Sequence, residues 1–184
     1  MSGPSGAGKT TLHQKLLLDR TMKKHLVKIV SATTRKKRPG ERPGQHYVFL
    51  TKAQFARNIK KGYFLEWQKV FTDHYGTPKA AAEKILRSGK SVLLCIDVKG
   101  ARVVFKAFKD AVGLFVTAPS FAALKERLQL RQTEDARALK RRLAVARQET
   151  KEARRYDYVV VNRKIARAVY ELKQIIKKEL KITT

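Results

Sequence analysis

The chain has 184 residues, of which 43% are apolar and 31% are charged. This length and composition predict one globular domain with a sizeable core, and they exclude a fibrous or wholly disordered chain. The 42 Lys and Arg residues against 15 Asp and Glu residues leave a net charge of +27, roughly one excess positive charge per seven residues. That excess excludes an acidic, solvating protein and indicates anionic partners.

Cysteine usage and hydropathy predict a cytoplasmic protein with no membrane contact. The single cysteine, Cys95, cannot form an internal disulfide, which is typical of an intracellular chain. No segment approaches the roughly 18–20 consecutive apolar residues that a membrane helix needs. The N-terminus opens into a glycine-rich turn instead of an apolar signal segment. Both a monomer and a homodimer are compatible with these features.

The first 77 residues predict a helix and then an inserted lobe that carries short strands. Leucines at helical spacing indicate the helix, and β-branched or aromatic runs between Pro/Gly breakers indicate the strands. The predicted elements are a helix at 10–18, a strand at 26–30, a basic loop at 33–44, a strand at 47–50, a helix ending at 62 and a strand at 63–71.

From residue 78 the pattern changes to helices that alternate with buried strands. The strands are nearly continuous apolar runs, as expected of strands covered on both faces. The predicted elements are a helix at 79–87, strands at 91–98 and 114–118, helices at about 119–131 and 134–155, a strand at 157–161 and a helix at 165–180. This alternation predicts an α/β fold with a parallel sheet flanked by helices.

A complete phosphate-binding motif, G-x-x-x-x-G-K-[ST], stands at residues 3–10. Its glycines let several backbone N–H groups converge on phosphate oxygens at the start of a helix. In such a loop Lys9 reaches the β- and γ-phosphates, and the Thr10 hydroxyl ligates Mg²⁺. A chance glycine-rich turn is the alternative, which the eight ordered positions disfavour. Only Met1 and Ser2 precede the loop where a buried strand is normal, so we expect weak anchoring of the loop and greater stability in a version extended upstream.

Four later segments stand in the same order as in a known family: 31–41, 62–67, 75–77 and 96–101. Together with the loop they resemble guanylate kinase, over essentially the whole chain. The resemblance implies a P-loop NTPase-type sheet with an inserted nucleoside-monophosphate lobe and a helical lid, which close over ATP and GMP. The implied parts are a core of 1–30, 78–120 and 149–184, a GMP-binding lobe at 31–77, and a lid at about 121–148.

The resemblance also implies roles for single residues. The implied ATP-binding residues are Gly3, Pro4, Ser5, Gly6, Ala7, Gly8, Lys9, Thr10, Thr11, Arg127 and Arg131. The implied GMP-binding residues are Ser31, Arg35, Arg38, Tyr47, Glu66, Tyr75, Gly76, Thr77 and Asp97. The implied catalytic cations are Lys9, Arg35, Arg131 and Arg142, and the implied Mg²⁺ ligands are Thr10 and Asp97. These assignments suit the chemistry, because a guanidinium fork matches phosphate oxygens and a carboxylate accepts from the N–H groups of guanine.

The sequence departs from the family pattern at three places. Cys95 stands where the family usually has the first acid of a D-x-D pair, which predicts either weaker binding and turnover or local repacking around a small apolar thiol. The turn at 131–133 lacks the family's glycine, and the turn at 162–164 is basic where the family's is more acidic.

The leading function is therefore Mg²⁺-dependent phosphoryl transfer from ATP to GMP. A related P-loop kinase of another phosphorylated small molecule is one alternative, although Glu66 with Thr77 disfavours it. A catalytically weak interaction module that binds protein or nucleic acid is another, although its phosphate loop is intact. The net charge also predicts weak, non-specific nucleic-acid binding. The remaining cations of the long basic helix are interpreted as a solvated face: Lys140, Arg141, Arg147, Lys151 and Arg154.

Overall fold

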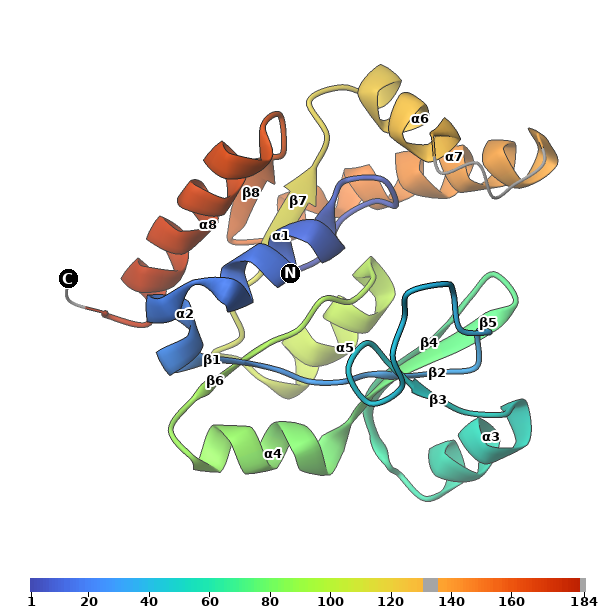
Figure 1. The fold of residues 1–184 in the computed structure, drawn as a ribbon, viewed down its shortest axis with the longest axis vertical. Helices are drawn as coiled ribbons and strands as arrows, with labels where there is room; N and C mark the ends of the chain where they lie inside the picture. The colour runs from blue at the N-terminus through green and yellow to red at the C-terminus, as the bar shows by residue number, and fades with distance from the viewer. Residues whose placement is uncertain (131–135, 183–184) are drawn as a thin grey trace.

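The structure, a computed structural model, describes residues 1–130 and 136–182. Figure 1 shows two groups of strands surrounded by helices. In chain order the elements are α1 (Lys9–Leu18), α2 (Arg20–His25), β1 (Leu26–Lys28), β2 (Ala32–Thr33), β3 (Val48–Phe49), α3 (Lys52–Lys60), β4 (Phe64–Val70), β5 (Asp73–Pro78), α4 (Lys79–Arg87), β6 (Ser91–Leu93), α5 (Val98–Ala107), β7 (Leu114–Thr117), α6 (Phe121–Gln129), α7 (Ala136–Lys151), the 3₁₀ turn η1 (Glu152–Arg155), β8 (Tyr158–Val161) and α8 (Ile165–Glu179).

The central sheet is parallel and is joined in its middle by the first two residues. β1 pairs with β6, and β7 pairs with β8, both in parallel register. Between these pairs Ser2 exchanges two 2.8 Å hydrogen bonds with β7, and the carbonyl oxygen of Met1 accepts one of 3.2 Å from Ile96 N. Met1 and Ser2 thus take the place of the buried strand that the phosphate loop requires, so the order across the sheet is β1, β6, residues 1–2, β7, β8.

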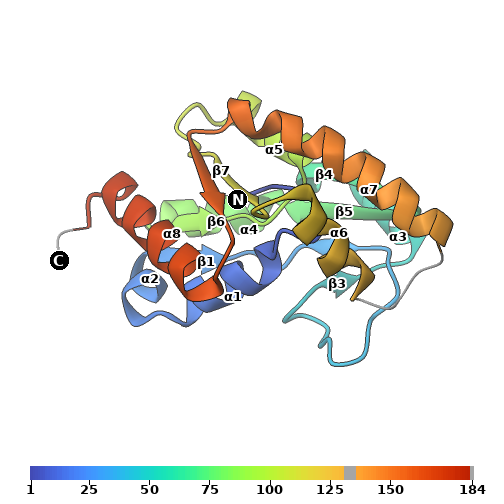
Figure 2. The same ribbon diagram turned by 90° about the horizontal axis from the view of Figure 1, so that it is seen from above.

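The main core lies between this sheet and the helices α1 and α8. Leu12 and Leu16 of α1 and Leu172 of α8 are fully buried against Val116 and Val160 of the strands. Figure 2 shows α1 and α8 on one side of these strands and α5 on the other. The sheet therefore has helices on both sides, as the sequence predicted.

A second sheet, in the strand order β3-β2-β5-β4, carries α3 and has its own small core. The ring of Phe55 on α3 stacks on that of Phe64 on β4, with 4.5 Å between the centroids. A capping box starts α3: the Thr51 side chain accepts from Gln54 N, and the Gln54 side chain accepts from Thr51 N. In Figure 1 this sheet lies at the lower right, with α6 and α7 at the upper right.

Several elements differ from the sequence-based expectation, among them β2 and β5, which were not predicted as strands. The strand expected at 91–98 ends at Leu93, because Asp97 caps a new helix, α5, by accepting a 2.7 Å hydrogen bond from Gly100 N. The short helix α2, capped by Asp19, stands between α1 and β1. The long basic helix ends as an α-helix at Lys151 and continues as the 3₁₀ turn η1.

Within residues 1–130 and 136–182, no helix is both long enough and apolar enough to cross a membrane.

Candidate active site

One cleft of about 470 Å³ brings together the phosphate loop, the second sheet and one face of α7. This volume is within the usual range for small-ligand sites. The sequence-predicted residues that line it are Gly3, Ser5, Gly6, Gly8, Lys9, Thr10, Ser31, Arg35, Arg38, Tyr47, Glu66, Tyr75, Gly76, Asp97 and Arg142. The cleft thus gathers residues that are up to about 140 positions apart in the chain.

The phosphate loop is held by contacts that its glycines allow. Gly3 has a φ of 140° and Gly8 a φ of 88°, values that other residues rarely adopt. A side chain at Gly8 would also collide with the amide of Asn162, which donates a 2.8 Å hydrogen bond to the carbonyl of Ala7. The Lys9 ammonium lies back over the loop and donates to the carbonyls of Gly3 (2.5 Å) and Pro4 (2.9 Å). The lysine is therefore held against carbonyl groups of the loop itself, in the wall of the cleft.

At the other end of the cleft, Glu66 is only 6% exposed and accepts a 2.6 Å hydrogen bond from the Thr77 hydroxyl. β4 and β5 position the pair, because Glu66 lies opposite Thr77 in their antiparallel register. Burial raises the pKa of Glu66 to about 7; the Thr77 hydrogen bond opposes this shift and the negative charge of Asp97 adds to it. The carboxyl group therefore changes between acceptor and donor near neutral pH.

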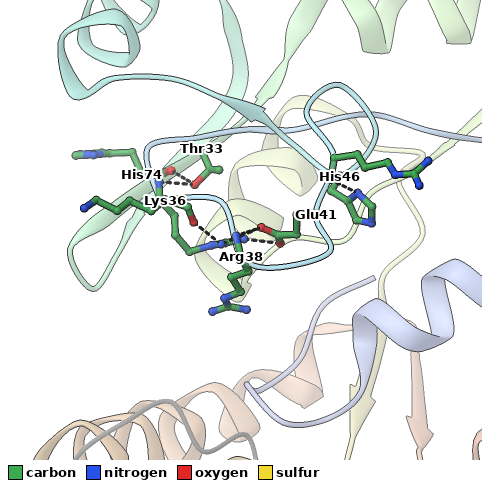
Figure 3. Close-up of polar contacts among 8 residues, drawn as sticks. Thr33, Lys36, Arg38, Glu41, His46 and His74 are labelled. Carbon is green, nitrogen blue, oxygen red and sulfur yellow. Dashed lines mark hydrogen bonds and ion pairs between the residues drawn. The ribbon is translucent and has the colours of Figure 1, made fainter.

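Between these two ends lies an arginine that is already bound to a carboxylate. Both terminal nitrogens of Arg35 donate to Glu41, at 2.7 and 3.1 Å, and Arg38 N donates to the same carboxylate at 2.8 Å. Figure 3 shows Glu41 held beside Arg38 in this loop. Burial alone would raise the pKa of Glu41, but these hydrogen bonds hold it below its usual value. The guanidinium of Arg35 also lies 5.5 Å from the ring centroid of Tyr47, so the site keeps a cation oriented in the cleft wall.

The inner face of α7 contributes one cation and one acid to the cleft. The guanidinium of Arg142 lies 5.5 Å from the ring centroid of Phe71, at the tip of the β4–β5 hairpin. Two turns along the helix, Glu149 accepts a 3.4 Å hydrogen bond from Ser5 N of the phosphate loop. Burial raises the pKa of Glu149, although the positive charge of Lys9 opposes the shift. A carboxylate thus contacts an amide of a loop built to bind phosphate.

Sequence reasoning missed Glu149 and several other residues that line the cleft. Glu149 is the only acid in α7. That isolated acid was the available signal, but the sequence interpretation of this helix considered only its Lys and Arg residues. Arg141, interpreted as part of a solvated face, lines the cleft although it is exposed. The other unpredicted lining residues are Gln68, Val70, Phe71, Thr72, Asp73, Ile96 and Ala138.

Some predicted residues lie elsewhere. Arg127 donates a 2.9 Å hydrogen bond to the carbonyl of Asn162, and Thr77 stands behind Glu66 rather than in the cleft wall. Pro4 and Ala7 are buried within the loop, and Thr11 is exposed on α1. Arg131 lies outside the described residues.

Cys95 also lines the cleft and packs against the main core. Burial raises the pKa of its thiol, although the charges of Lys9, the N-terminus and Lys28 oppose the shift. The thiol is therefore neutral at ordinary pH, and position 95 supplies no second negative charge next to Asp97.

The oxygen donors in the cleft fit a lightly coordinated Mg²⁺ ion. In the part of the chain that the structure describes, no three His, Cys, Asp or Glu side chains gather to form a metal cage. The Thr10 hydroxyl and the Asp97 carboxylate line the cleft together with the phosphate loop. Mg²⁺ usually keeps several waters and is held by one or two carboxylates plus substrate phosphates, so this sparse donor set suits it.

The matches to known proteins extend over nearly all of this chain. The family model "Guanylate kinase" matches residues 1–179. The guanylate kinase of Symbiobacterium thermophilum is 45% identical over 179 residues, which cover 97% of this chain and 83% of that protein. The guanylate kinase of Wolbachia pipientis wMel is 46% identical over 180 residues, which cover 97% of this chain and 88% of that protein. The crystal structure of guanylate kinase from Anaplasma phagocytophilum superposes with a TM-score of 0.79 at 32% identity, covering 100% of this chain and 85% of that one.

Proposed function

This chain belongs to the guanylate kinase family, and we propose that the cleft described above transfers a phosphoryl group from ATP to GMP with the help of Mg²⁺. Family membership makes the chain a nucleoside monophosphate kinase, as its resemblance implied. The observation that carries the residue assignment is the meeting of the phosphate loop, the Arg35–Glu41 pair and the Glu66–Thr77 pair in one cleft.

We assign ATP to the phosphate-loop end. The backbone N–H groups of residues 5–10 and the start of α1 offer donors to its phosphates, and Lys9 adds a positive charge. To reach those phosphates, the ammonium group exchanges the carbonyls of Gly3 and Pro4 for phosphate oxygens. Arg142 of α7 adds a further cation to the cleft lining.

We assign GMP to the end formed by the second sheet. The ionised carboxylate of Glu66 accepts hydrogen bonds from guanine N1–H and the 2-amino group, which adenine cannot offer as a pair, while Thr77 orients it. The GMP phosphate takes the place of Glu41 on the Arg35 fork. The remaining contacts of this end come from Ser31, Arg38, Tyr47, Tyr75 and Gly76.

The chemistry follows from positioning and charge. Phosphoryl transfer needs no covalent nucleophile from the protein, since orientation and neutralisation of the transferring group carry most of the catalysis. Lys9, Arg35 and Arg142 line the cleft from three different segments of the chain. Mg²⁺, held by Thr10 and Asp97 together with the phosphates, supplies further charge neutralisation when bound.

We also propose the division into parts that the resemblance implied. Residues 31–77, which contain β2 to β5, act as the GMP-binding lobe, and residues of about 121–148 act as the lid. The support is that the β4–β5 hairpin and the inner face of α7 line the same cleft and meet where Arg142 lies over Phe71.

A coupled assay of ADP release with GMP, AMP, CMP or UMP as acceptor tests the proposal. We expect turnover with GMP to exceed that with each other acceptor by at least about a hundredfold, since a site built to hydrogen-bond one base rejects others strongly. Lys9→Ala serves as the inactive control. Equal turnover with AMP, or turnover that survives in Lys9→Ala, would contradict the assignment.

We propose a second, weaker property, the non-specific binding of nucleic acid through excess positive charge. Two phosphate-rich substrates account for roughly half a dozen cations, far fewer than the excess of 27. Such binding falls steeply with salt, because neutralised phosphates release their counterions. Binding that is absent at low salt, or independent of salt, would refute this property.

A further inference from the structure

The outer face of α7 carries a row of five exposed cations, which we name the α7 stripe: Arg137, Lys140, Arg141, Arg147 and Lys151. Their spacings of three, four, ten and fourteen residues from Arg137 place them along one side of the helix. The exposed residues between them, Ala144 and Gln148, carry no charge. The row is about 21 Å long at 1.5 Å per residue.

In residues 1–130 and 136–182, no acid is paired with this row. The one acid of α7, Glu149, points to the phosphate loop on the other side of the helix. Among the described residues no member of the α7 stripe forms an ion pair, although the Arg147 guanidinium stacks 4.7 Å above the ring of Phe121 on α6. The row is therefore a concentrated source of positive potential.

Other exposed helices mix the two signs of charge. On α4, Glu83 lies 4.0 Å from Lys79 and 3.9 Å from Arg87. On α8, which also contains Glu171 and Glu179, Lys173 is paired with Asp19 at 2.5 Å. The density of uncompensated cations thus distinguishes α7 from these two helices.

We propose that the α7 stripe is a binding site for the phosphate backbone of nucleic acid, an inference that rests on the second property proposed above. At 3.4 Å per phosphate along one strand, 21 Å of helix faces about six phosphates. The stripe offers point charges and forks for phosphate oxygens, and α7 itself has no aromatic residue on which a base could stack. The neighbouring ring of Phe121 on α6, 36% exposed, already stacks against the Arg147 guanidinium. Recognition is therefore independent of sequence.

A nucleic acid fits this face better than an anionic membrane does. Helices that lie on membranes bury large apolar side chains such as Trp, Phe or Leu beside their cations. The outer face of α7 presents Ala144 and Gln148 there, and its exposed apolar residue, Val145, is small and 43% exposed. The adjacent ring of Phe121 on α6 is 36% exposed and stacks against the Arg147 guanidinium. The face can attract anions but has little to insert between acyl chains.

The stripe and the cleft use different faces of the same helix, which meet at Arg141. Arg142 and Glu149 line the cleft, and of the five stripe residues only Arg141 does so. Lys140 and Lys151 can therefore be changed without touching the residues assigned to substrate.

The test compares two double variants that remove the same charge from different places. Lys140→Gln/Lys151→Gln neutralises the stripe, and Lys84→Gln/Lys90→Gln neutralises two exposed lysines on or after α4, near Glu83. Affinity for a 20-nucleotide single-stranded RNA and a 20-base-pair DNA is measured by fluorescence anisotropy between 25 and 200 mM NaCl. Kinase activity with GMP is measured in parallel.

We expect the stripe variant to lose about 2 units of the slope of log K against log salt on duplex DNA, and to bind about tenfold more weakly at 50 mM salt. The α4 variant keeps the wild-type slope, and both variants keep wild-type kinase activity. Equal losses in both variants would overturn the location while leaving the general property intact. If the wild type bound neither probe at 25 mM salt, the general property itself would fail. Binding to vesicles with 30% phosphatidylserine but to neither nucleic acid would overturn the choice of partner.

Discussion

The carboxyl group of Glu66 is buried in the cleft wall, and its pKa of about 7 makes guanine recognition dependent on pH. Burial is the main cause of the raised pKa. The ionised form accepts from guanine, so we expect the affinity for GMP to increase as the pH rises through about 7. For folding the sign is opposite: because the folded pKa exceeds the unfolded one, the contribution to stability is complete below about pH 4.5 and is lost as the pH rises through about 7.

Replacing Glu66 by Gln separates these two effects. An amide places a donor against a guanine N–H group, which costs about 1–3 kcal/mol and raises KM for GMP by roughly 5- to 150-fold. We expect the rise in GMP affinity between pH 6 and 8 to disappear in Glu66→Gln, while Tm at pH 8 does not fall. Steady-state kinetics and thermal melts across this pH range measure both, with Glu83→Gln, a half-buried acid on α4 outside the cleft, as the control. Unchanged KM for GMP in Glu66→Gln would contradict its role as the guanine reader.

Glu149 places a negative charge at an amide where a phosphate is to bind. We expect Glu149→Gln to bind ATP more tightly, by roughly five- to tenfold in the absence of Mg²⁺, because the repulsion between carboxylate and phosphate is removed. Arg142→Gln, changed on the same helix face, should weaken ATP binding by a similar factor. Isothermal titration calorimetry with ATP measures whether the affinity increases in Glu149→Gln and decreases in Arg142→Gln. Weaker binding of ATP in Glu149→Gln would show that the carboxylate assists the nucleotide instead.

At the scale of elements, the phosphate loop is supported by the end of β8 through a single side chain. The side-chain amide of Asn162 donates to the carbonyl of Ala7, and the backbone carbonyl of Asn162 accepts from Arg127 on α6. It therefore links the loop, the sheet and the helix that leads toward α7.

Truncating this side chain tests the link. Asn162→Ala leaves the carbonyl of Ala7 without its partner and opens a small cavity, so we expect a loss of about 1–3 kcal/mol in the free energy of unfolding and a higher KM for ATP. Arg163→Ala, an exposed neighbour, is the control. Denaturant melts and ATP kinetics provide the readout; a stable variant with unchanged KM for ATP would show that the loop holds its own shape.

Some helices and strands were predicted closely from the sequence patterns, and others were not. The alternation of apolar runs predicted the parallel sheet and helices such as α4 and α8 closely. The pattern failed at 91–98, because an extended apolar run does not reveal that Asp97 caps a helix, and β-branched Val98, Val103 and Val104 concealed α5. The motifs predicted most of the cleft wall. Glu149 and the pairing of Arg35 with Glu41 depend on tertiary contacts that spacing alone does not encode.

At the scale of the whole molecule, 42 cations against 15 acids make self-repulsion a cost of folding. Salt shortens the range of this repulsion from about 30 Å at 0.01 M to about 8 Å at 0.15 M. We expect Tm to rise by about 2–4 °C between these NaCl concentrations, equivalent to about 1 kcal/mol for a chain of this size. Differential scanning calorimetry measures the change. NaCl is preferred to phosphate or sulfate, because those anions also bind helix N-termini and would stabilise by mass action. A Tm that falls with NaCl would mean that attractive pairs outweigh the repulsion.

The position of Met1 and Ser2 in the sheet has a consequence for how the enzyme matures. Met1 bonds to Leu94, 93 residues later, and Ser2 bonds to Leu114 and Val116. Contacts at such sequence separations form slowly, because the entropy cost of closing a long loop comes before the favourable energy of the contact. The segment before the phosphate loop can therefore find its place only after β6 and β7 have formed on either side of it. During refolding, the far-UV circular dichroism signal of helices such as α7 and α8 should recover first. Nucleotide binding should recover in the last phase, when residues 1–2 take their place between β6 and β7.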